Sequence, residues 1–115
     1  MIQRYRRALF QVDLDPVVGS EQSGRRPVLV VGNEAFNQAM PVLTVLPLSS
    51  TRRRLYPAEV MLKRAVAGQS VDSIIMAHQV RTISKHRIGE AVGYLSEPSI
   101  REQVRRALRD HLDLG

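Results

Sequence analysis

The sequence predicts an α+β fold: a compact, barrel-like antiparallel sheet of five to six short strands, followed by one long C-terminal helix. Short extended apolar runs recur between turn residues, as they do in small antiparallel sheets. The final segment instead repeats apolar residues at every fourth position, which is typical of an amphipathic helix. The chain has 115 residues, 43% of them hydrophobic and 24% charged. This is enough for one core and too little for two, so residues 1–115 are expected to form a single domain.

The first half of the chain contains three predicted strands and one long loop. Leu9–Leu14 is extended and ends before a proline, because the residue before proline is pushed out of the helical region. The polar stretch 19–26 has a glycine near each end and predicts a loop long enough to carry function. Pro27–Val31 is a continuous apolar run, typical of a central strand covered on both faces. Val42–Leu48 resumes the extended pattern after a helical turn capped by Asn33.

Three more strands are predicted in the second half. Pro57–Leu62 alternates apolar with polar residues and places Glu59 on the polar side. Ser73–Ala77 is apolar throughout, and Ala91–Leu95 is a brief last strand. A short helical turn is expected to begin at Ser84.

The terminal helix is the longest predicted element. Ser96 is its expected N-cap, with Glu97 in the first turn, where a carboxylate favours the positive end of the helix dipole. Its apolar stripe is expected to pack on the sheet and consists of Ile100, Val104, Leu108 and Leu112.

Arginine dominates the charge of the chain. There are 17 Lys and Arg against 11 Asp and Glu, a net charge of +6, and only Lys63 and Lys85 are lysines. The planar guanidinium binds phosphate and carboxylate in a bidentate manner, so this excess favours a polyanion or an acidic protein as partner.

Several other classes of protein are disfavoured. There is no cysteine, which excludes disulfides, thiolate metal sites and cysteine nucleophiles. No apolar run approaches the roughly 20 residues of a membrane span, and the N-terminal residues lack a signal-peptide core. The chain has no glycine-rich phosphate loop, no dinucleotide fingerprint and no metal-binding histidine pair. We therefore expect a cytoplasmic protein without a metal or cofactor.

Polar side chains gather at predicted strand ends and loop edges. RNA supplies its own nucleophile, the 2′-hydroxyl, so cleavage requires only orientation, a proton acceptor, a proton donor and stabilisation of developing charge. Arginine and hydroxyl groups can provide that stabilisation, although ordinary salt bridges and loop polarity account for the same residue types. The strand-end groups are Glu21, Gln22, Arg25, Arg26, Ser49, Ser50, Gln79 and Arg81.

Two segments resemble the MazF/PemK (Kid-like) family of type II toxins, which are endoribonucleases. Residues 13–31 look like the opening of that family, and Gln79–Ile83 looks like its second hallmark. Asn33, Asn37 and residues 41–49 follow the family's course between them. The resemblance implies an SH3-like barrel, shared with the CcdB group, and spans nearly the whole chain.

The resemblance also implies roles for individual residues. Arg26, immediately before the proline, is similar to the catalytic arginine, and Ser49 lies where a Thr or Ser hydroxyl completes the catalytic site. His78 stands where some relatives have a carboxylate, so its imidazole is a candidate proton acceptor, although a tolerated surface histidine fits the sequence equally. The residues expected to bind substrate are Glu21, Gln22, His78, Gln79 and Arg81.

The implied function is the toxin of a type II toxin-antitoxin system. It would be a metal-independent, sequence-specific endoribonuclease that cleaves single-stranded mRNA to 2′,3′-cyclic phosphate and 5′-hydroxyl ends. The implied partners are RNA, a second copy in a homodimer whose interface carries the RNA groove, and an acidic MazE-like antitoxin. One alternative is a non-enzymatic CcdB-like gyrase poison, but the chain lacks the tryptophan of that group. The other is an RNA-binding module, for which three Tyr and two Phe offer few stacking surfaces.

Two positions depart from the family pattern. Members often begin with Arg-Gly-Asp before the first strand, whereas this chain has Arg6-Arg7-Ala8. The missing glycine and acid put the local geometry and charge in question. Ser23 replaces a second glycine in the first loop, which is expected to stiffen that loop.

Overall fold

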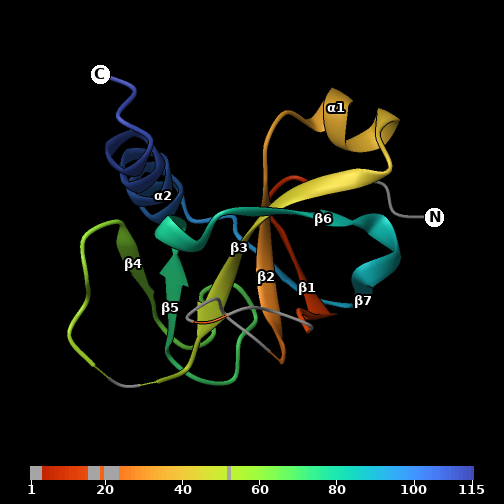
Figure 1. Cartoon of the computed structure of the whole chain (residues 1–115). Coiled ribbons are helices and arrows are strands. Elements are labelled where there is room, and N and C mark those ends of the chain that lie inside the picture. The colour runs from red at the N-terminus through yellow and green to blue at the C-terminus, as the bar shows by residue number, and fades with distance from the viewer. Residues whose placement is uncertain (1–3, 16–18, 20–23, 52) are drawn as a thin grey trace.

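The sheet of this protein curls into a partial barrel with one long helix across its end (Figure 1). The computed structural model describes residues 4–15, 19, 24–51 and 53–115. In this part of the chain all strand pairs are antiparallel, and the sheet has seven strands. In chain order the elements are β1 (Ala8–Asp13), β2 (Arg25–Val31), α1 (Glu34–Ala39), β3 (Val42–Ser49), β4 (Glu59–Leu62), β5 (Ser73–Met76), the 3-10 turn η1 (Ala77–Gln79), β6 (Arg81–Ser84), the 3-10 turn η2 (Lys85–Arg87), β7 (Ile88–Tyr94) and α2 (Pro98–His111).

The strand order is β4-β5-β3-β2-β1-β7, with β6 paired to β3 outside this path. Strand β3 joins the two parts of the sheet, since its first half pairs with β6 and its last residues pair with β5. The predicted α+β class and C-terminal helix are confirmed. Strand β6 is the addition to the predicted five to six strands. Of its four residues only Ile83 is buried, so β6 has no apolar run that the sequence could have revealed.

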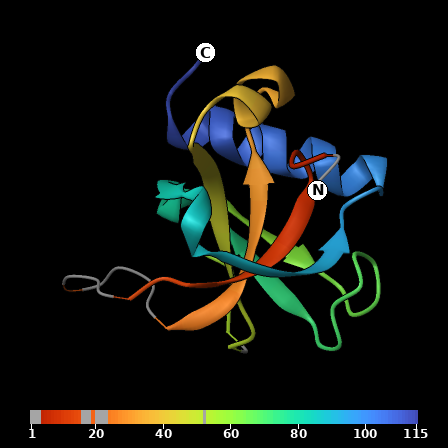
Figure 2. The same ribbon diagram turned by 90° about the vertical axis from the view of Figure 1, so that its right-hand side faces the viewer.

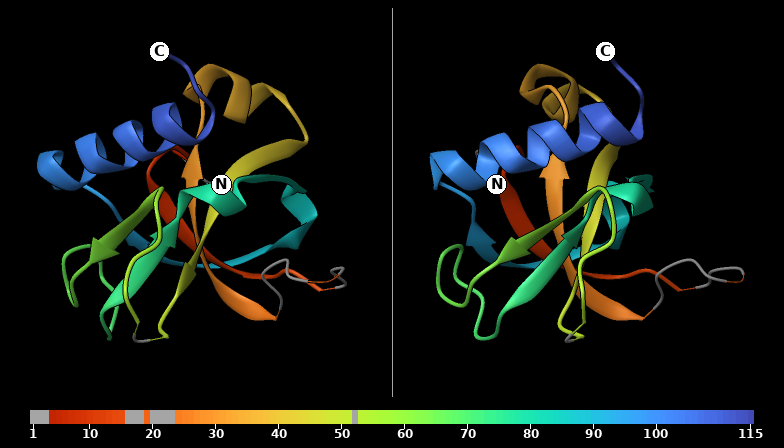
Figure 3. Two further views of the ribbon diagram at one scale, coloured as in Figure 1. Left: turned by 60° about the vertical axis from the view of Figure 1, so that its left-hand side comes forward. Right: turned by 90° about the vertical axis from the view of Figure 1, so that its left-hand side faces the viewer.

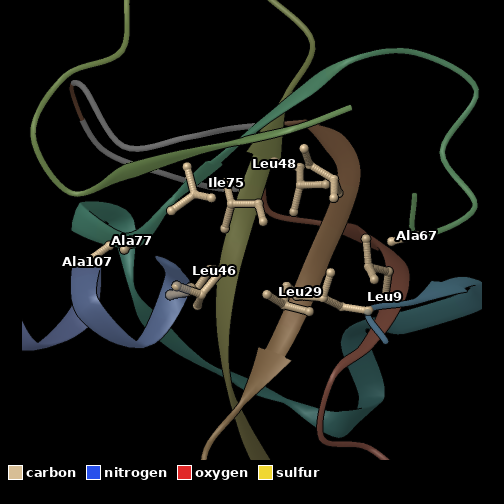
Figure 4. Packing of buried hydrophobic residues seen from close by; sticks show 12 residues of the cluster. Leu9, Leu29, Leu46, Leu48, Ala67, Ile75, Ala77 and Ala107 are labelled. Atoms are coloured by element: carbon tan, nitrogen blue, oxygen red, sulfur yellow. The ribbon is translucent and has the colours of Figure 1, made fainter. Parts of the chain in front are cut away.

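Strand β2 is covered on both faces, as its continuous apolar run predicted. Leu29 belongs to one buried cluster, and Val28 and Val30 belong to the other. Successive side chains of a strand point to opposite faces, so a strand between two cores has no polar side. Figure 4 shows the first cluster, in which Leu29 lies among residues of neighbouring strands and Ala107 of α2 lies beside Ala77.

Helix α2 packs on the sheet differently from the prediction in two details. Its N-cap is Glu97, whose carboxylate accepts a hydrogen bond from the Ser99 N–H at 3.3 Å, rather than Ser96. The reason is Pro98, whose fixed φ suits the first helical position and sets the cap directly before it. At the other end, Leu112 is the C-cap and is 49% exposed, so the predicted apolar stripe is one residue too long.

The two ends of the barrel differ. Helices α1 and α2 lie at one end, and the loop between β4 and β5 lies at the other (Figures 2 and 3). Strand β2 runs from the loop end, where Arg25 begins it, to the helical end, where Val31 closes it. In the described ranges, no helix is long and apolar enough to cross a membrane.

Candidate active site

A polar cleft of about 580 Å³ opens near the loop end of β2. Four parts of the chain bound it: the start of β2, the end of β3, the β4–β5 loop and β7. Polar groups line it from each of these elements, among them Arg25, Arg26, Ser49, Gln69 and Glu90. The cleft therefore brings together residues that lie more than 60 positions apart in the chain, such as Arg26 and Glu90.

Arg26 is held at this cleft by the strand pairing of β2. It lies opposite Val12 of β1, and its Nη1 donates a hydrogen bond to the carbonyl oxygen of Leu48 in β3 at 3.0 Å. The side chain is partly buried, and this burial lowers the pKa of the Arg26 guanidinium. Arginine nevertheless keeps its charge at neutral pH, so Arg26 presents a partly desolvated cation, which acts on a nearby anion more strongly than one in bulk water.

Ser49 is the last residue of β3 and lies on the same edge of the cleft. The register pairs Val28 with Pro47, and continuing it by two residues sets Arg26 opposite Ser49. The Ser49 hydroxyl oxygen accepts a hydrogen bond from the Thr51 N–H at 3.2 Å. That bond uses an oxygen lone pair, so the hydroxyl proton can still be donated to a ligand. The two predicted catalytic residues thus meet at one site.

His78, Gln79 and Arg81 occupy another part of the molecule. They are not among the residues that line the cleft of Arg26. Arg81 pairs with Val45, four residues before Ser49 on β3. At about 3.3 Å per residue, this separation is roughly 13 Å along the strand. In one protomer, the second predicted motif therefore lies at a distance from the first.

His78 is engaged by a buried carboxylate. Its Nε2 lies 2.9 Å from Oε2 of Glu59, whose side chain is fully buried. Arg53 donates two hydrogen bonds to the same carboxylate, both at 2.7 Å, and the Tyr56 N–H donates a third at 2.7 Å. Glu59 was predicted on the polar side of its strand, and this was wrong: the carboxylate points inward because Arg53, Tyr56 and His78 together satisfy it.

The electrostatics of Glu59 follow from these partners. Burial alone would raise its pKa, but the hydrogen bonds from Arg53, the Tyr56 N–H and His78, with the charge of Arg53, lower it to about 2. Glu59 is therefore ionised at neutral pH and ties together the β3–β4 loop, β4 and η1. We infer a structural role for this cluster, since it lies outside the Arg26 cleft.

The long first loop is anchored at its base. Glu21 and Gln22, predicted to bind substrate, lie outside the described residues, as does Ser23. Beside them, the Leu14 N–H donates to the Gly24 carbonyl oxygen at 3.0 Å, and the Gly24 N–H donates to Asp15 at 3.1 Å. Arg87 Nη1 donates to the carbonyl oxygens of Asp13 and Asp15 at 3.1 and 3.0 Å. The loop thus begins and ends at fixed points beside the cleft.

Sequence reasoning missed two groups that line the cleft. Glu90 of β7 is the carboxylate in its lining, among the residues that the structure describes. Gln69 is buried in the β4–β5 loop, where its Nε2 donates to the Val92 carbonyl oxygen at 3.3 Å. Gly93 permits this packing, because a Cβ there would lie 1.8 Å from the Ala67 carbonyl oxygen. Gly93 was the available signal, since a glycine within a strand often marks a close backbone approach.

The chemistry available at the cleft is that of fixed charge and hydrogen bonding. Its described lining offers two guanidinium groups, hydroxyl groups, two amides and one carboxylate. Within the described ranges, no group of three or more His, Asp or Glu side chains is placed to hold a metal ion. Such a donor set suits a phosphodiester, whose oxygens accept from arginine and serine.

The altered start of the chain keeps the geometry that a glycine would provide. Arg7 has φ +74°, in the left-handed region. Its N–H donates to the Val30 carbonyl oxygen at 2.9 Å, and its carbonyl oxygen accepts from the Leu95 N–H at 2.8 Å. The Glu34 carboxylate also accepts from the N–H groups of Tyr5 and Arg6, at 2.8 and 2.7 Å. Arg7 thus adopts the backbone geometry that a glycine would adopt, while the local charge differs from that of the family pattern.

Known proteins resemble the chain over nearly its whole length. The family described as PemK-like, MazF-like toxin of type II toxin-antitoxin system matches residues 5–112. The protein named Endoribonuclease MazF9 from Mycobacterium tuberculosis is 37% identical over 92% of this chain and 93% of its own length. MazF from Deinococcus radiodurans superposes with a TM-score of 0.80 at 28% identity, covering 94% of both chains. A MazE–MazF structure from the same organism gives 0.73 at 26% identity, covering 95% of each chain.

Proposed function

The chain belongs to the PemK-like, MazF-like toxin family of type II toxin-antitoxin systems, and we propose that it cleaves single-stranded mRNA at the cleft of Arg26. It is an endoribonuclease toxin, like the MazF9 relative of Mycobacterium tuberculosis. This membership favours the endoribonuclease over both alternatives, the gyrase poison and the RNA-binding module. The observation that carries the proposed site is the partly buried Arg26 guanidinium in a polar cleft opposite Ser49.

The proposed reaction needs neither a metal nor an enzyme nucleophile. The RNA 2′-hydroxyl oxygen attacks the adjacent phosphorus, and the bond from phosphorus to the 5′-oxygen breaks. The products are a 2′,3′-cyclic phosphate and a 5′-hydroxyl, and the leaving 5′-oxygen takes a proton from solvent. Arg26 stabilises the negative charge that grows on the phosphoryl oxygens, and the Ser49 hydroxyl donates to one of them.

A proton acceptor is required for the 2′-hydroxyl. We assign this role to Glu90, because it is the carboxylate that lines the cleft in the part of the chain described. His78 was the candidate from sequence, but in one protomer it lies outside this cleft and is hydrogen-bonded to Glu59. General-base catalysis requires the acceptor within hydrogen-bond reach of the proton, so geometry favours Glu90.

Substrate binding is proposed to extend beyond the cleft. Glu21 and Gln22 belong to the loop between β1 and β2, His78 and Gln79 lie in η1, and Arg81 begins β6. All five residues can bind one RNA molecule only if the bound RNA extends over several nucleotides, or if a second protomer places its own His78, Gln79 and Arg81 near the cleft. A homodimer with the groove across its interface meets this requirement.

The partner and the compartment complete the proposal. An acidic antitoxin would suit the net charge of +6 by placing carboxylates against arginine. The MazE–MazF structure of Deinococcus radiodurans supports a partner of this class. We place the toxin, a single domain, in the cytoplasm with its mRNA substrate.

The test is incubation of the purified protein with single-stranded RNA in EDTA, followed by analysis of both product ends. We expect cleavage that leaves 5′-hydroxyl ends and that is lost in Arg26→Ala. The matched control is Arg106→Ala, which removes an exposed arginine of α2 far from the cleft. Uncleaved RNA, or equal cleavage by Arg26→Ala and the unmodified protein, would refute the proposed site.

A further inference from the structure

A smaller pocket adjoins the cleft of Arg26 on the side of β4 and β5. It has a volume of about 200 Å³, and Ser50 and Ser73 line both the pocket and the cleft. Figure 3 shows β4, β5 and the chain that follows β3 side by side at the loop end of the barrel. A nucleic acid whose phosphate lies on Arg26 can therefore reach this pocket, which we call the side pocket. Its other described lining residues are Thr51, Arg53, Met61, Asp72 and Ile74.

The floor of the side pocket is apolar. Met61 of β4 and Ile74 of β5 are partners in the strand register, so their side chains lie on the same face of the sheet. Their neighbours Val60, Leu62 and Ile75 belong to the first buried cluster. Successive side chains point to opposite faces, so Met61 and Ile74 point away from that cluster and towards the pocket. A flat aromatic ring would meet hydrocarbon and a thioether sulfur here, which is a favourable contact.

The rim of the side pocket carries hydrogen-bonding groups. Asp72 is exposed, and its Oδ1 accepts a hydrogen bond from the Arg64 N–H at 2.7 Å. A carboxylate has about four acceptor positions, so this bond holds Asp72 in place while the carboxylate can still accept from a ligand. The hydroxyl groups of Ser50 and Thr51 lie on the same rim.

Arg53 forms a fixed wall of the side pocket. Its two Nη atoms each donate to the Glu59 carboxylate at 2.7 Å. Its guanidinium carbon also lies 4.3 Å from the centroid of the Tyr56 ring, which covers one face of the cation. Arg53 therefore gives the pocket a rigid wall whose charge is already paired with Glu59.

The carboxylate of Asp72 distinguishes between possible ligands. It repels phosphate, so the group that it accepts from must be a hydrogen-bond donor. The amino groups of cytosine, adenine and guanine are such donors, whereas uracil presents a carbonyl oxygen where cytosine has its amino group. The pocket is somewhat larger than the roughly 150 Å³ protein cavity that accepts a benzene molecule, so it has room for one base.

We propose that the side pocket binds one base of the RNA close to the cleaved bond and selects a base that carries an amino group over uracil. The ring lies on Met61 and Ile74, and Asp72 accepts from the amino group. This inference rests on the proposed function, because it takes single-stranded RNA as the ligand. Asp72 is then a residue that determines sequence specificity, while Arg26 and Ser49 contact the phosphate.

The test compares two fluorescein-labelled hexanucleotides, oligodeoxycytidylate and oligodeoxyuridylate, whose bases have the same ring size and differ in the polar edge. Neither has a 2′-hydroxyl, so the unmodified protein cannot cleave them by the proposed reaction. Fluorescence anisotropy measures the affinity. We expect the cytidylate to bind about tenfold more tightly, because a charge-assisted hydrogen bond replaces repulsion between two acceptors. We also expect its NMR methyl shifts to gather at Met61 and Ile74.

Asp72→Asn is the discriminating variant. Its side-chain oxygen can still accept from the Arg64 N–H, and its amide can donate to uracil as well as accept from cytosine. The tenfold preference is therefore expected to fall to about twofold, with the thermal unfolding midpoint unchanged. The matched control is Asp110→Asn, which removes the same charge from an exposed position on α2 and is expected to keep the full preference.

Four results would overturn the proposal. These are equal affinity of the unmodified protein for the two hexanucleotides, methyl shifts away from Met61 and Ile74, a preference that Asp72→Asn keeps, and a preference that Asp110→Asn also loses. The cleavage test has a separate outcome. RNA cleavage together with equal hexanucleotide affinities would retain the proposed active site and reject the side pocket. A preference that depends on Asp72, without RNA cleavage, would retain the side pocket and reject the proposed reaction.

Discussion

Arg26 reaches across from β2 and donates a hydrogen bond to the carbonyl oxygen of Leu48, the residue immediately before Ser49. One contact thus fixes the guanidinium and the strand end that carries the hydroxyl. Preorganised groups cost no reorganisation when charge develops in the transition state. The predicted catalytic pair is therefore positioned by a contact between β2 and β3.

The first prediction concerns the charge of Arg26. Arg26→Ala is expected to lower kcat for RNA cleavage by about 10²–10³-fold, the usual effect of removing one transition-state donor. Arg26→Lys is expected to recover only part of the loss, since an ammonium cannot bind two phosphoryl oxygens in a fork. Single-turnover cleavage of a labelled RNA measures both. Full activity of the lysine variant would show that charge alone suffices.

The second prediction concerns the hydroxyl of Ser49. Ser49→Ala is expected to lower kcat by about tenfold, the equivalent of one hydrogen bond of about 1.4 kcal/mol. The same change removes the acceptor of the Thr51 N–H. Ser49→Thr keeps the hydroxyl and is expected to retain most of the activity. If the alanine and threonine variants were equally impaired, packing at the end of β3 would explain the loss and the catalytic role would fall.

The third prediction concerns the buried carboxylate of Glu59. Glu59→Gln is expected to reduce the free energy of unfolding at pH 7 by roughly 2–4 kcal/mol. Breaking a buried ion pair usually costs slightly more, but here Arg53 and His78 reach solvent and can be hydrated in the variant. Urea unfolding of both proteins measures the difference. The kcat for RNA cleavage at a temperature where both proteins are folded should change little, because Glu59 lies outside the cleft, whereas KM is expected to rise because Glu59 holds the proposed RNA-binding residue His78.

The pH dependence of that difference follows from the pKa of Glu59. The pKa of Glu59 in the folded protein is about 2, below the ordinary glutamate value of 4.5 that applies to the unfolded chain. A depressed folded pKa gives stability that is present above about pH 4.5 and is lost as the pH falls toward 2. The difference in the free energy of unfolding between the unmodified protein and Glu59→Gln should therefore become smaller on acidification below pH 4.5. A difference that stayed constant with pH would contradict the ionised state assigned to Glu59.

The Glu59 cluster is a set of contacts that could not be predicted from the sequence. Alternation in β4 placed Glu59 on the polar face, because a single sequence does not reveal that Arg53, Tyr56 and His78 converge on it. Continuous apolar runs did predict β2 and β5, since burial on both faces leaves a strong pattern. Arg26 and Ser49 could be assigned because the resemblance to the toxin family implied their roles, and they lie in β2 and β3. Glu90 could not, because its place in the cleft depends on β7 pairing with β1 across most of the chain.

The fourth prediction concerns Arg7. Arg7→Gly is expected to raise the free energy of unfolding by about 0.5–1 kcal/mol, since relief of the left-handed strain exceeds the entropy cost of glycine. The change also removes repulsion from Arg101 and Arg6. Arg7→Ala is the matched control, because it removes the same charge and keeps the strain. If both variants were stabilised equally, charge would be the cause and conformational strain would contribute nothing.

The fifth prediction tests Glu90 as the proton acceptor. Glu90→Gln keeps the size of the side chain and is expected to lower kcat by about 10²-fold or more, the usual contribution of a general base. KM should change little. Glu102→Gln, an exposed position on α2, controls for the change in net charge. Full activity of Glu90→Gln would show that Glu90 is not the proton acceptor. The remaining candidates would be residues of the first loop and His78 of a second protomer.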